Sequence, residues 1–340
     1  MAGLDVSVVM PVRDAADTLE MALSSVLQSR GVELELICID DGSEDESGKL
    51  LDLAAAQEPR LRVLHTDARG IVSALNTGLD HAAAPLVARM DADDEMLPER
   101  LAAQAAYLAG HPEAALVGCQ VECFRAGGLG EGYRLYADWV NGLVKPDEIE
   151  RQVFVECPIP HPTWMFRRDL IRGLGGYRDR DWPEDLDLLY RVLETGARLG
   201  KVPRVLHRWR DHPRRLSRVD SAYGREAFAR VKAHFLPSLH PMPAAIVWGA
   251  GRTGRRFVRL LEAEGLPTRV MLDVNPRRIG TTWRGIPIFS PSQLRTRAAA
   301  WRGEGLWLLV AVASRGARQE IREHLRTLGF SEGEDFLVVA

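Results

Sequence analysis

The chain has 340 residues, of which 46% are apolar, and its formal net charge is −3. A chain of this length can bury one large or two moderate globular cores. A nearly neutral balance gives no reason to expect nucleic acid as a partner, although a local charged patch could still act.

The N-terminal segment "MAGLDVSVVMPVRD" has no basic leader before a long apolar run, so no signal peptide is expected. The longest apolar stretch, residues 305–313, is far shorter than the ~20 residues of a membrane helix. The cysteines form no CxxC pair, which indicates structural thiols in a reducing compartment. We therefore expect a cytoplasmic protein, with any membrane contact peripheral and at the inner face.

Short apolar runs alternate with amphipathic stretches through the first half of the chain. This alternation is typical of an α/β sheet with crossover helices. The predicted strands are 6–12, 34–40, 61–65, 86–90 and 114–124. Helices are predicted at 15–28 and 70–82, and Ser43 is predicted to cap a further helix after the second strand. The first half therefore predicts a mixed sheet flanked by helices.

The second half is predicted to contain a loop, further regular structure and a domain boundary. Four glycines in 125–136 indicate a mobile loop or a reshaped segment rather than regular structure. A helix is predicted at 184–196, short strands at 198–203 and 204–210, and a helix at 221–234. Three prolines within 236–243 predict a linker. The expected domains are therefore 1–235 and 244–340.

The second predicted domain carries a glycine pattern directly after a strand. Gly249, Gly251 and Gly254 form GxGxxG, and Asp273 follows about twenty residues later, as in dinucleotide-binding sites. The alternative is that the glycines only allow a strand and a helix to pack closely. We expect a small Rossmann-like α/β domain with a regulatory, packing or oligomerising role. NAD or another nucleotide, and an assembly of several copies, are open alternatives.

Three carboxylates follow the strand predicted at 86–90. Asp91, Asp93 and Asp94 fall within "VARMDADDEMLPERL", and packed acids repel one another unless a positive group offsets them. Ligands of open α/β sheets bind beyond the carboxyl ends of the strands, where Arg13 and Asp41 also follow strands. A divalent cation is therefore the first candidate. The alternative, that Asp94 caps the next helix, explains one acid but not the set.

Four segments resemble successive motifs of the family 2 inverting glycosyltransferases of the GT-A fold. They are "VSVVMPVRDAADTLEMALSSVLQS", "ELICIDDGSEDES", "GIVSALNTGLDHAAAPLVARMDADDEMLPERL" and "WPEDLDLLYRVLETG". The resemblance runs over about residues 5–220 and implies a GT-A type mixed sheet. It also implies transfer of a sugar from a nucleoside diphosphate donor, a UDP-sugar in most relatives, to a hydroxyl acceptor. A glycan or lipid-linked acceptor in polysaccharide or glycoconjugate assembly is expected.

The same resemblance implies roles for individual residues. Asp41 would accept from the nucleotide base, Asp185 would be the general base with Glu184 beside it, and Asp93 would hold Mn²⁺ or Mg²⁺. The donor-binding candidates are Pro11, Val12, Arg13, Asp41, Arg69, Asn76, Asp91, Ala92, Arg210 and Ser217. The metal-binding candidates are Asp93, Asp91 and His212. The acceptor-pocket candidates are His161 and Trp164, with a core position as the alternative for Trp164.

One position departs from the family pattern. Relatives have Ala-Arg-Asn before the acidic motif, whereas this chain has Ala74-Leu75-Asn76. Arg69 or Arg89 could replace the missing arginine, or donor binding could be weaker. The departure keeps a sugar-nucleotide or NAD sensor in view as an alternative. A nucleotidyltransferase is a second alternative, although no glycine-rich, lysine-bearing loop lies near the N-terminus.

Overall fold

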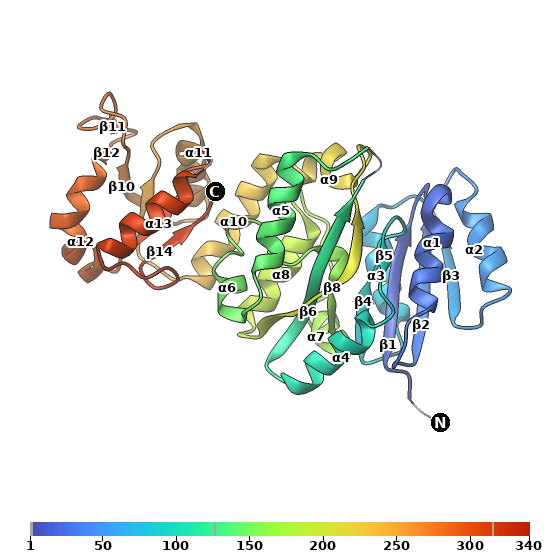
Figure 1. The fold of residues 1–340 in the computed structure, drawn as a ribbon. Coiled ribbons are helices and arrows are strands. Elements are labelled where there is room, and N and C mark those ends of the chain that lie inside the picture. The colour runs from blue at the N-terminus through green and yellow to red at the C-terminus, as the bar shows by residue number, and fades with distance from the viewer. Residues whose placement is uncertain (1–2, 126, 315) are drawn as a thin grey trace. The chain divides into compact units, whose positions relative to one another are not determined.

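The computed structural model describes residues 3–125, 127–314 and 316–340, which form two compact units (Figure 1). The first unit comprises the chain up to Glu150, Pro158–Arg180 and Glu184–Asp220. The second comprises Arg151–Cys157, Asp181–Pro183 and Ser221–Ala340. The expected linker at 236–243 falls inside the second unit, because helix α10 (Arg225–Leu239) continues through Pro237 and contacts α11 (Arg252–Ala263).

The first unit contains an eight-stranded mixed sheet in the order β3-β2-β1-β4-β7-β6-β8-β5. The strands are β1 (Val6–Val12), β2 (Leu34–Asp41), β3 (Leu61–Thr66), β4 (Leu86–Arg89), β5 (Glu95–Met96), β6 (Ala114–Phe124), β7 (Met165–Arg167) and β8 (Arg198–Arg210). Strands β1 to β4 are mutually parallel where they pair, and the antiparallel β7 joins β4 to β6. The carboxyl ends of β1, β2, β4, β6 and β8 therefore lie at one edge of the sheet.

The helices of the first unit connect and cover these strands (Figure 1). They are α1 (Ala16–Leu27), α2 (Ser47–Ala55), α3 (Ile71–His81), α4 (Arg100–Gly110), α5 (Glu131–Gly142), α6 (Pro146–Glu150), α7 (Arg168–Gly173), α8 (Glu184–Glu194), α9 (Leu216–Val219) and the 3₁₀ turn η1 (His161–Thr163). This architecture confirms the predicted mixed α/β, GT-A type fold.

Burial of both faces explains why the central strands are continuous apolar runs. Every residue of β1 is buried, and Val8 and Met10 share a core with Leu19 and Leu23 of α1. On α3, a Cβ added at Gly78 would lie 2.3 Å from a methyl carbon of Val9. That glycine therefore allows α3 to approach the sheet closely.

Several local predictions are wrong. Residues 131–136 belong to helix α5 rather than a loop, and residue 126 lies outside the described residues. The two short strands predicted at 198–210 are one strand, β8. Ser43 does not cap α2; its Oγ accepts a hydrogen bond from the backbone N–H of Asp14 at 3.1 Å. This bond ties the loop after β2 to the loop after β1.

The second unit contains a six-stranded sheet in the order β11-β12-β10-β9-β13-β14. Its elements are η2 (Ser221–Tyr223), α10, β9 (Ala245–Trp248), α11, β10 (Thr268–Leu272), β11 (Thr282–Trp283), β12 (Ile286–Phe289), η3 (Pro291–Gln293), α12 (Leu294–Gly303), β13 (Trp307–Val310), α13 (Ala317–Thr327) and β14 (Phe336–Val338). Pairing is parallel except between β11 and β12. The strand order reverses at β9, as in doubly wound sheets.

A buried lysine ties α10 to two other segments of the second unit. Lys232 is 6% exposed, and its ammonium donates to the carbonyl oxygens of Val155 at 2.8 Å and Val339 at 3.4 Å. Burial lowers its pKa from 10.5 to about 8. Between pH 8 and pH 10.5, Lys232 therefore carries its proton in more of the unfolded chains than of the folded chains. The free energy of unfolding is therefore expected to rise by ~3 kcal/mol from pH 8 to pH 10.5.

The Lys232→Met variant isolates this contribution, because methionine keeps most of the volume and cannot titrate. Urea unfolding at pH 7.5 and 9.5 is the measurement. The wild type should gain stability over that interval relative to the variant. If the free energy of unfolding changed equally with pH in the two proteins, Lys232 would have the same pKa in the folded and unfolded chain, which would contradict the prediction.

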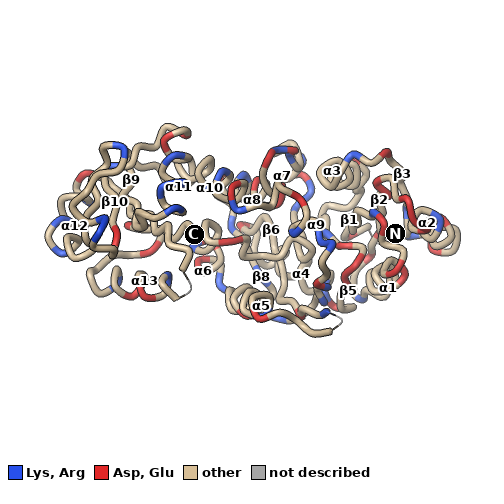
Figure 2. Tube along the Cα trace, turned by 90° about the horizontal axis from the view of Figure 1, so that it is seen from above, with Lys and Arg blue, Asp and Glu red and all other residues tan. Residues whose placement is uncertain are grey.

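Charged positions are spread along both units, with acidic and basic residues interspersed (Figure 2). Among the described residues, no helix has both the length and the apolar character of a membrane span.

Candidate active site

Three carboxylates lie close together just beyond β4. Asp91, Asp93 and Asp94 each place an oxygen within 4.8 Å of the others. Asp94 is completely buried, whereas Asp91 and Asp93 are partly exposed. Each carboxylate has a different polar or positively charged neighbour.

Arg89, the last residue of β4, pairs with Asp91. Its Nη2 lies 2.6 Å from Asp91 Oδ1, and the arginine side chain is only 8% exposed. Burial lowers the pKa of Arg89, but the charges of Asp91, Tyr177 and Glu184 and the hydrogen bond to Asp91 together outweigh burial, and the net shift is upward. Among the described residues, the buried Nε and Nη1 of Arg89 have no hydrogen-bond partner.

His212, beyond the end of β8, contacts Asp93. The distance from His212 Nε2 to Asp93 Oδ2 is 2.8 Å, and both side chains are about one-third exposed or less. Burial raises the pKa of Asp93, but the hydrogen bond with His212 and the charge of Arg215 outweigh it and lower the pKa. The structure therefore brings together two of the predicted metal ligands, Asp93 and His212.

Asp94 belongs to a buried chain of polar groups. Its Oδ2 lies 2.9 Å from His207 Nε2, and its Oδ1 accepts the backbone N–H of Arg210 at 2.8 Å. The other ring nitrogen, His207 Nδ1, lies 3.1 Å from Arg100 Nη1. A guanidinium only donates, so Nδ1 accepts and Nε2 carries the proton that it donates to Asp94. Burial and the charge of Arg100 lower the pKa of His207 and keep the ring neutral.

Burial and the charges of Asp93 and Asp91 raise the pKa of Asp94 well above its usual value. The geometry nevertheless makes Asp94 the acceptor in both of its hydrogen bonds. Its oxygens are thus engaged by protein donors, whereas the side chains of Asp91 and Asp93 are 23% and 27% exposed. Asp94 therefore has a structural role and holds the acidic loop against β8.

Arg100 of α4 joins the acidic cluster to η1. The side chain is fully buried, and Nη2 donates to the carbonyl oxygens of Arg89 and Pro162, each at 2.8 Å. Its Nε donates to Gln104 Oε1 at 3.1 Å. One guanidinium thus fixes the end of β4, the turn at η1 and, through His207, strand β8.

The Arg100→Met variant is expected to lose at least ~3 kcal/mol of unfolding free energy. Methionine leaves two buried carbonyls and one imidazole nitrogen without donors, and each unsatisfied group costs about 1–3 kcal/mol. Urea unfolding measures the loss. Arg60→Met is the control, because Arg60 is exposed and pairs with Glu58 at the surface. Equal stability of the two variants would contradict the proposed network.

The residues of this cluster fit a hard divalent cation. Carboxylate oxygens suit Mg²⁺ and Mn²⁺, and three of them converge here with an imidazole beside Asp93. Asp91 and Asp93 are the members with partly exposed side chains. These two side chains, with His212, would hold the ion.

The loops after β1 and β2 form the adjoining part of the same sheet edge. Asp41 accepts the backbone N–H groups of Arg69 and Gly70, both at 2.8 Å, and lies 3.8 Å from Arg13 Nη1. These bonds anchor the loop before α3. The Arg69 guanidinium is 65% exposed and pairs with Asp67 instead of the acidic cluster.

Three further predicted donor residues have mainly backbone roles. Pro11 and Val12 are buried in β1 and pair with β2. Ala92 is 6% exposed, and its carbonyl oxygen accepts from Thr18 Oγ1 at 2.9 Å. These residues therefore fix the backbone at the carboxyl edge of the sheet.

The predicted residues of the 204–218 region separate in space. Arg210 Nε donates to the backbone oxygen of Asp93 at 2.8 Å, and the guanidinium lies 4.5 Å from the ring centroid of Phe124. Arg210 is therefore committed to the acidic loop. Ser217 is exposed on α9.

The predicted base lies in the first turn of α8, next to a buried aromatic cluster. Glu184 is 5% exposed and lies 3.5 Å from His161 Nδ1, while His161 Nε2 lies 2.9 Å from the hydroxyl of Tyr177. Burial and the charge of Arg89 lower the pKa of His161, so its ring is neutral. Asp185 is partly exposed and accepts the backbone N–H of Leu186 at 2.7 Å.

Two predicted site residues have structural positions instead. Trp164 is fully buried and its indole N–H donates to Ile159 O, so no ring face is open to a sugar. The Asn76 amide donates to the carbonyl of Tyr177 at 2.9 Å and accepts its N–H at 2.8 Å. Asn76 therefore holds Tyr177 against the site, and direct donor contact is not needed to explain it.

The glycine pattern of the second unit has a packing explanation. A Cβ on Gly254 would lie 1.6 Å from Gly249 O, and Gly249 itself has a φ of +123°. Asp273 is 6% exposed and accepts from the Ala250 N–H and from Arg278 Nη1, both at 2.9 Å. Gly251 begins the turn into α11. The carboxylate that follows the glycine pattern is thus used within the protein, and NAD binding is not supported.

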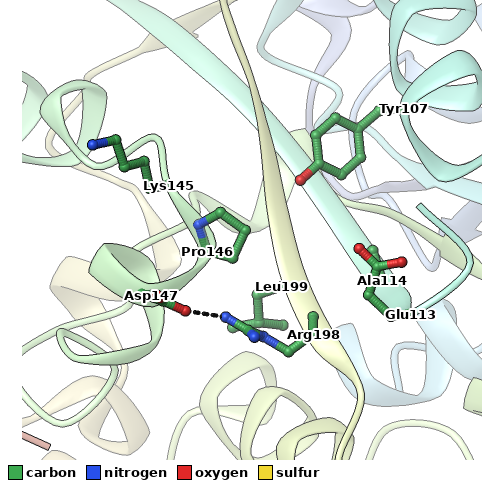
Figure 3. Close-up of a pocket in the computed structure, with 8 residues that line it drawn as sticks. All are labelled: Tyr107, Glu113, Ala114, Lys145, Pro146, Asp147, Arg198 and Leu199. Atoms are coloured by element: carbon green, nitrogen blue, oxygen red, sulfur yellow. Dashed lines mark hydrogen bonds and ion pairs between the residues drawn. The ribbon is translucent and has the colours of Figure 1, made fainter. Parts of the chain in front are cut away.

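A surface pocket of about 330 Å³ lies elsewhere in the first unit (Figure 3). It is lined at the amino ends of β6 and β8 by Ala114, Arg198 and Leu199, and Arg198 pairs with Asp147 there. This is the opposite edge of the sheet from Asp91. The pocket therefore belongs to a different surface from the acidic cluster.

Sequence comparison gives matches over the unit that holds this cluster. Residues 7–175 match the model of "Glycosyl transferase family 2". The amylovoran biosynthesis glycosyltransferase AmsE of Erwinia amylovora is 30% identical over 195 residues, which cover 57% of this chain and 71% of that protein. The putative glycosyltransferase EpsE of Bacillus subtilis is 29% identical over 215 residues, covering 62% and 74%.

Structure comparison agrees on the fold. The crystal structure of S. aureus TarS 1–349 has a TM-score of 0.51 and 16% identity, covering 77% of this chain and 70% of that one. The same protein in complex with UDP-GlcNAc has a TM-score of 0.52 and 14% identity, covering 77% and 71%. Neither alternative, sensor nor nucleotidyltransferase, is supported by these matches. The chain belongs to glycosyl transferase family 2 and is a glycosyltransferase.

Proposed function

We propose that this enzyme is a metal-dependent, inverting glycosyltransferase whose donor is a nucleoside diphosphate sugar, with UDP as the nucleotide. The acceptor is the hydroxyl of a glycan or of a lipid-linked saccharide. The observation that carries the proposal is the position of Arg89. This residue pairs with Asp91 of the acidic cluster, and its backbone N–H donates at 2.8 Å to Trp164 O, next to His161 and Glu184. These contacts support one site for the donor-side and base-side carboxylates.

On the donor side, Asp91 and Asp93, with His212, would hold Mn²⁺ or Mg²⁺. A cation at this position supplies positive charge to the departing diphosphate. The protein contributes the fixed geometry: Arg100, His207 and Asp94 hold the loop that carries the two exposed acids. The loops anchored by Asp41 provide the neighbouring surface for the nucleotide.

On the acceptor side, Asp185 is the proposed general base. Its carboxylate removes the proton of the acceptor hydroxyl while that oxygen bonds to the anomeric carbon. The bond from this carbon to the diphosphate breaks on the opposite face, and the electron pair leaves with the diphosphate. Attack opposite the leaving group inverts the configuration of the sugar.

Thermal unfolding with a panel of nucleoside diphosphates and their sugars, with and without Mn²⁺, tests the proposal. A ligand at a hundred times its dissociation constant adds ~2.7 kcal/mol to the unfolding free energy. We expect Mn²⁺-dependent stabilisation by uridine nucleotides. Absence of stabilisation by every nucleotide would contradict the donor class.

A further inference from the structure

Arg89 is an incompletely satisfied cation at the centre of the site. Its side chain is only 8% exposed. Its one ion pair in the described structure is with Asp91. The buried Nε and Nη1 have no acceptor among the described residues. A buried donor without a partner costs about 1–3 kcal/mol, so a native protein rarely keeps two on one side chain without a role.

The groups around Arg89 come from both halves of the site. Asp91 lies on its donor side at 2.6 Å. On the other side, the Arg89 N–H donates to Trp164 O at 2.8 Å, and the Trp164 ring packs on His161 with the ring centroids 4.6 Å apart. His161 Nδ1 lies 3.5 Å from Glu184, which is on α8 and 5% exposed. Glu184 is therefore the buried carboxylate on the base side of the contacts that surround Arg89.

We propose that Arg89 is a positioning residue that links donor binding to placement of the catalytic base. In the unliganded protein its guanidinium pairs with Asp91. When Asp91 turns to a donor-bound cation, the released Nη2 and the neighbouring Nε of the guanidinium bind Glu184. This pairing fixes the first turn of α8, and with it Asp185, only after the donor is bound. The inference rests on the proposed function.

The shape of the arginine side chain matters for this role. A guanidinium presents donors in a planar fork and can face two carboxylates, whereas a lysine ammonium is a single compact charge. The Arg89→Lys variant should retain the pair with Asp91 and lose much of the link to Glu184. The Arg89→Met variant should lose both contacts.

Hydrogen–deuterium exchange of the backbone amides of residues 186–190 measures how donor binding affects the start of α8. The measurement needs no acceptor saccharide. The full-length protein is compared with and without saturating UDP and Mn²⁺. The variants are Arg89→Met and Arg89→Lys. Arg167→Met is the matched control: Arg167 lies on the neighbouring strand β7 and donates only to backbone carbonyls, those of Ala114 and Leu108 among them.

In the wild type and in Arg167→Met, UDP with Mn²⁺ should slow exchange at 186–190 by about tenfold, the equivalent of one charge-assisted hydrogen bond. Arg89→Met should still be stabilised by the nucleotide and show no such slowing. If Arg89→Met fails to fold, Arg89→Lys carries the test, with slowing of about threefold or less expected.

Two results would overturn this proposal and leave the proposed function standing. One is full slowing in the folded Arg89 variant at saturating nucleotide. The other is a wild type that is stabilised by UDP and Mn²⁺ but shows no slowing at 186–190. A wild type that no nucleotide stabilises would instead refute the proposed function, and this inference with it.

Discussion

Asparagine in place of Asp185 is expected to slow sugar transfer by ~10²–10⁴-fold, the usual contribution of a general base. Donor affinity should change little, because Asp185 lies on α8 and the proposed cation ligands lie beyond β4 and β8. Loss of turnover at constant donor affinity identifies an interaction made only in the transition state. The measurement is release of the nucleoside diphosphate in the presence of a panel of saccharide acceptors.

Asp169→Asn is the matched control for this change. Asp169 is 84% exposed in the first turn of α7 and pairs only with the neighbouring Arg168 in the described structure. Its replacement should leave release unchanged. Wild-type release by Asp185→Asn would remove Asp185 from the mechanism, and loss of donor binding in that variant would place it on the donor side.

The second large effect is expected for Asp93→Asn. The amide keeps the size of the carboxylate and can still bond to His212, but it removes the charge that would hold the cation. We expect Mn²⁺ affinity, followed by electron paramagnetic resonance, to fall by about 10²-fold or more. The ~2.7 kcal/mol of nucleotide-dependent stabilisation should disappear at concentrations that saturate the wild type.

Two comparisons separate this loss from simple destabilisation. Asp67→Asn, at an 89% exposed position, should bind Mn²⁺ like the wild type. Asp94→Asn should mainly lower the unfolding free energy, because Asp94 is fully buried between His207 and the Arg210 N–H. Unchanged Mn²⁺ affinity in Asp93→Asn would show that the cluster does not hold the cation through this residue.

The framework of the first unit could be predicted because its signals are local. The strand at 6–12 and the helix around 16–27 follow from runs and periodicities within single segments. The position of Asp91 and Asp93 at the carboxyl edge follows from the same rules, because parallel strands end together. These features need no knowledge of distant contacts.

The residues that support the site through long-range contacts could not be predicted from local patterns. Asp94 and His207 meet across 113 positions, and Asn76 and Tyr177 across 101. Sequence spacing gave no reason to prefer Arg89 over Arg69, whereas burial and the 2.6 Å contact with Asp91 do. Buried polar pairs of this kind arise from tertiary packing, which no local pattern records.

Two local patterns were misleading for physical reasons. The glycines through Gly132 suggested a loop over 125–136, but α5 begins at Glu131, is amphipathic, and packs its Val140 in a cluster with Val121 and Trp209. The GxGxxG pattern matched a nucleotide site, yet Gly249 and Gly254 are required by the packing where β9 and α11 meet. Glycine reports a backbone or packing requirement, and the requirement need not involve a ligand.

Real-time proton magnetic resonance of the sugar released or transferred from UDP-sugar donors tests the central claim most directly. From an α-linked donor, cation-dependent inversion predicts that the β anomer appears first and that release stops when Mn²⁺ is chelated. Asp185→Asn should slow the release by ~10²–10⁴-fold. First appearance of the α anomer, or release that persists without a divalent cation, would contradict the proposed mechanism.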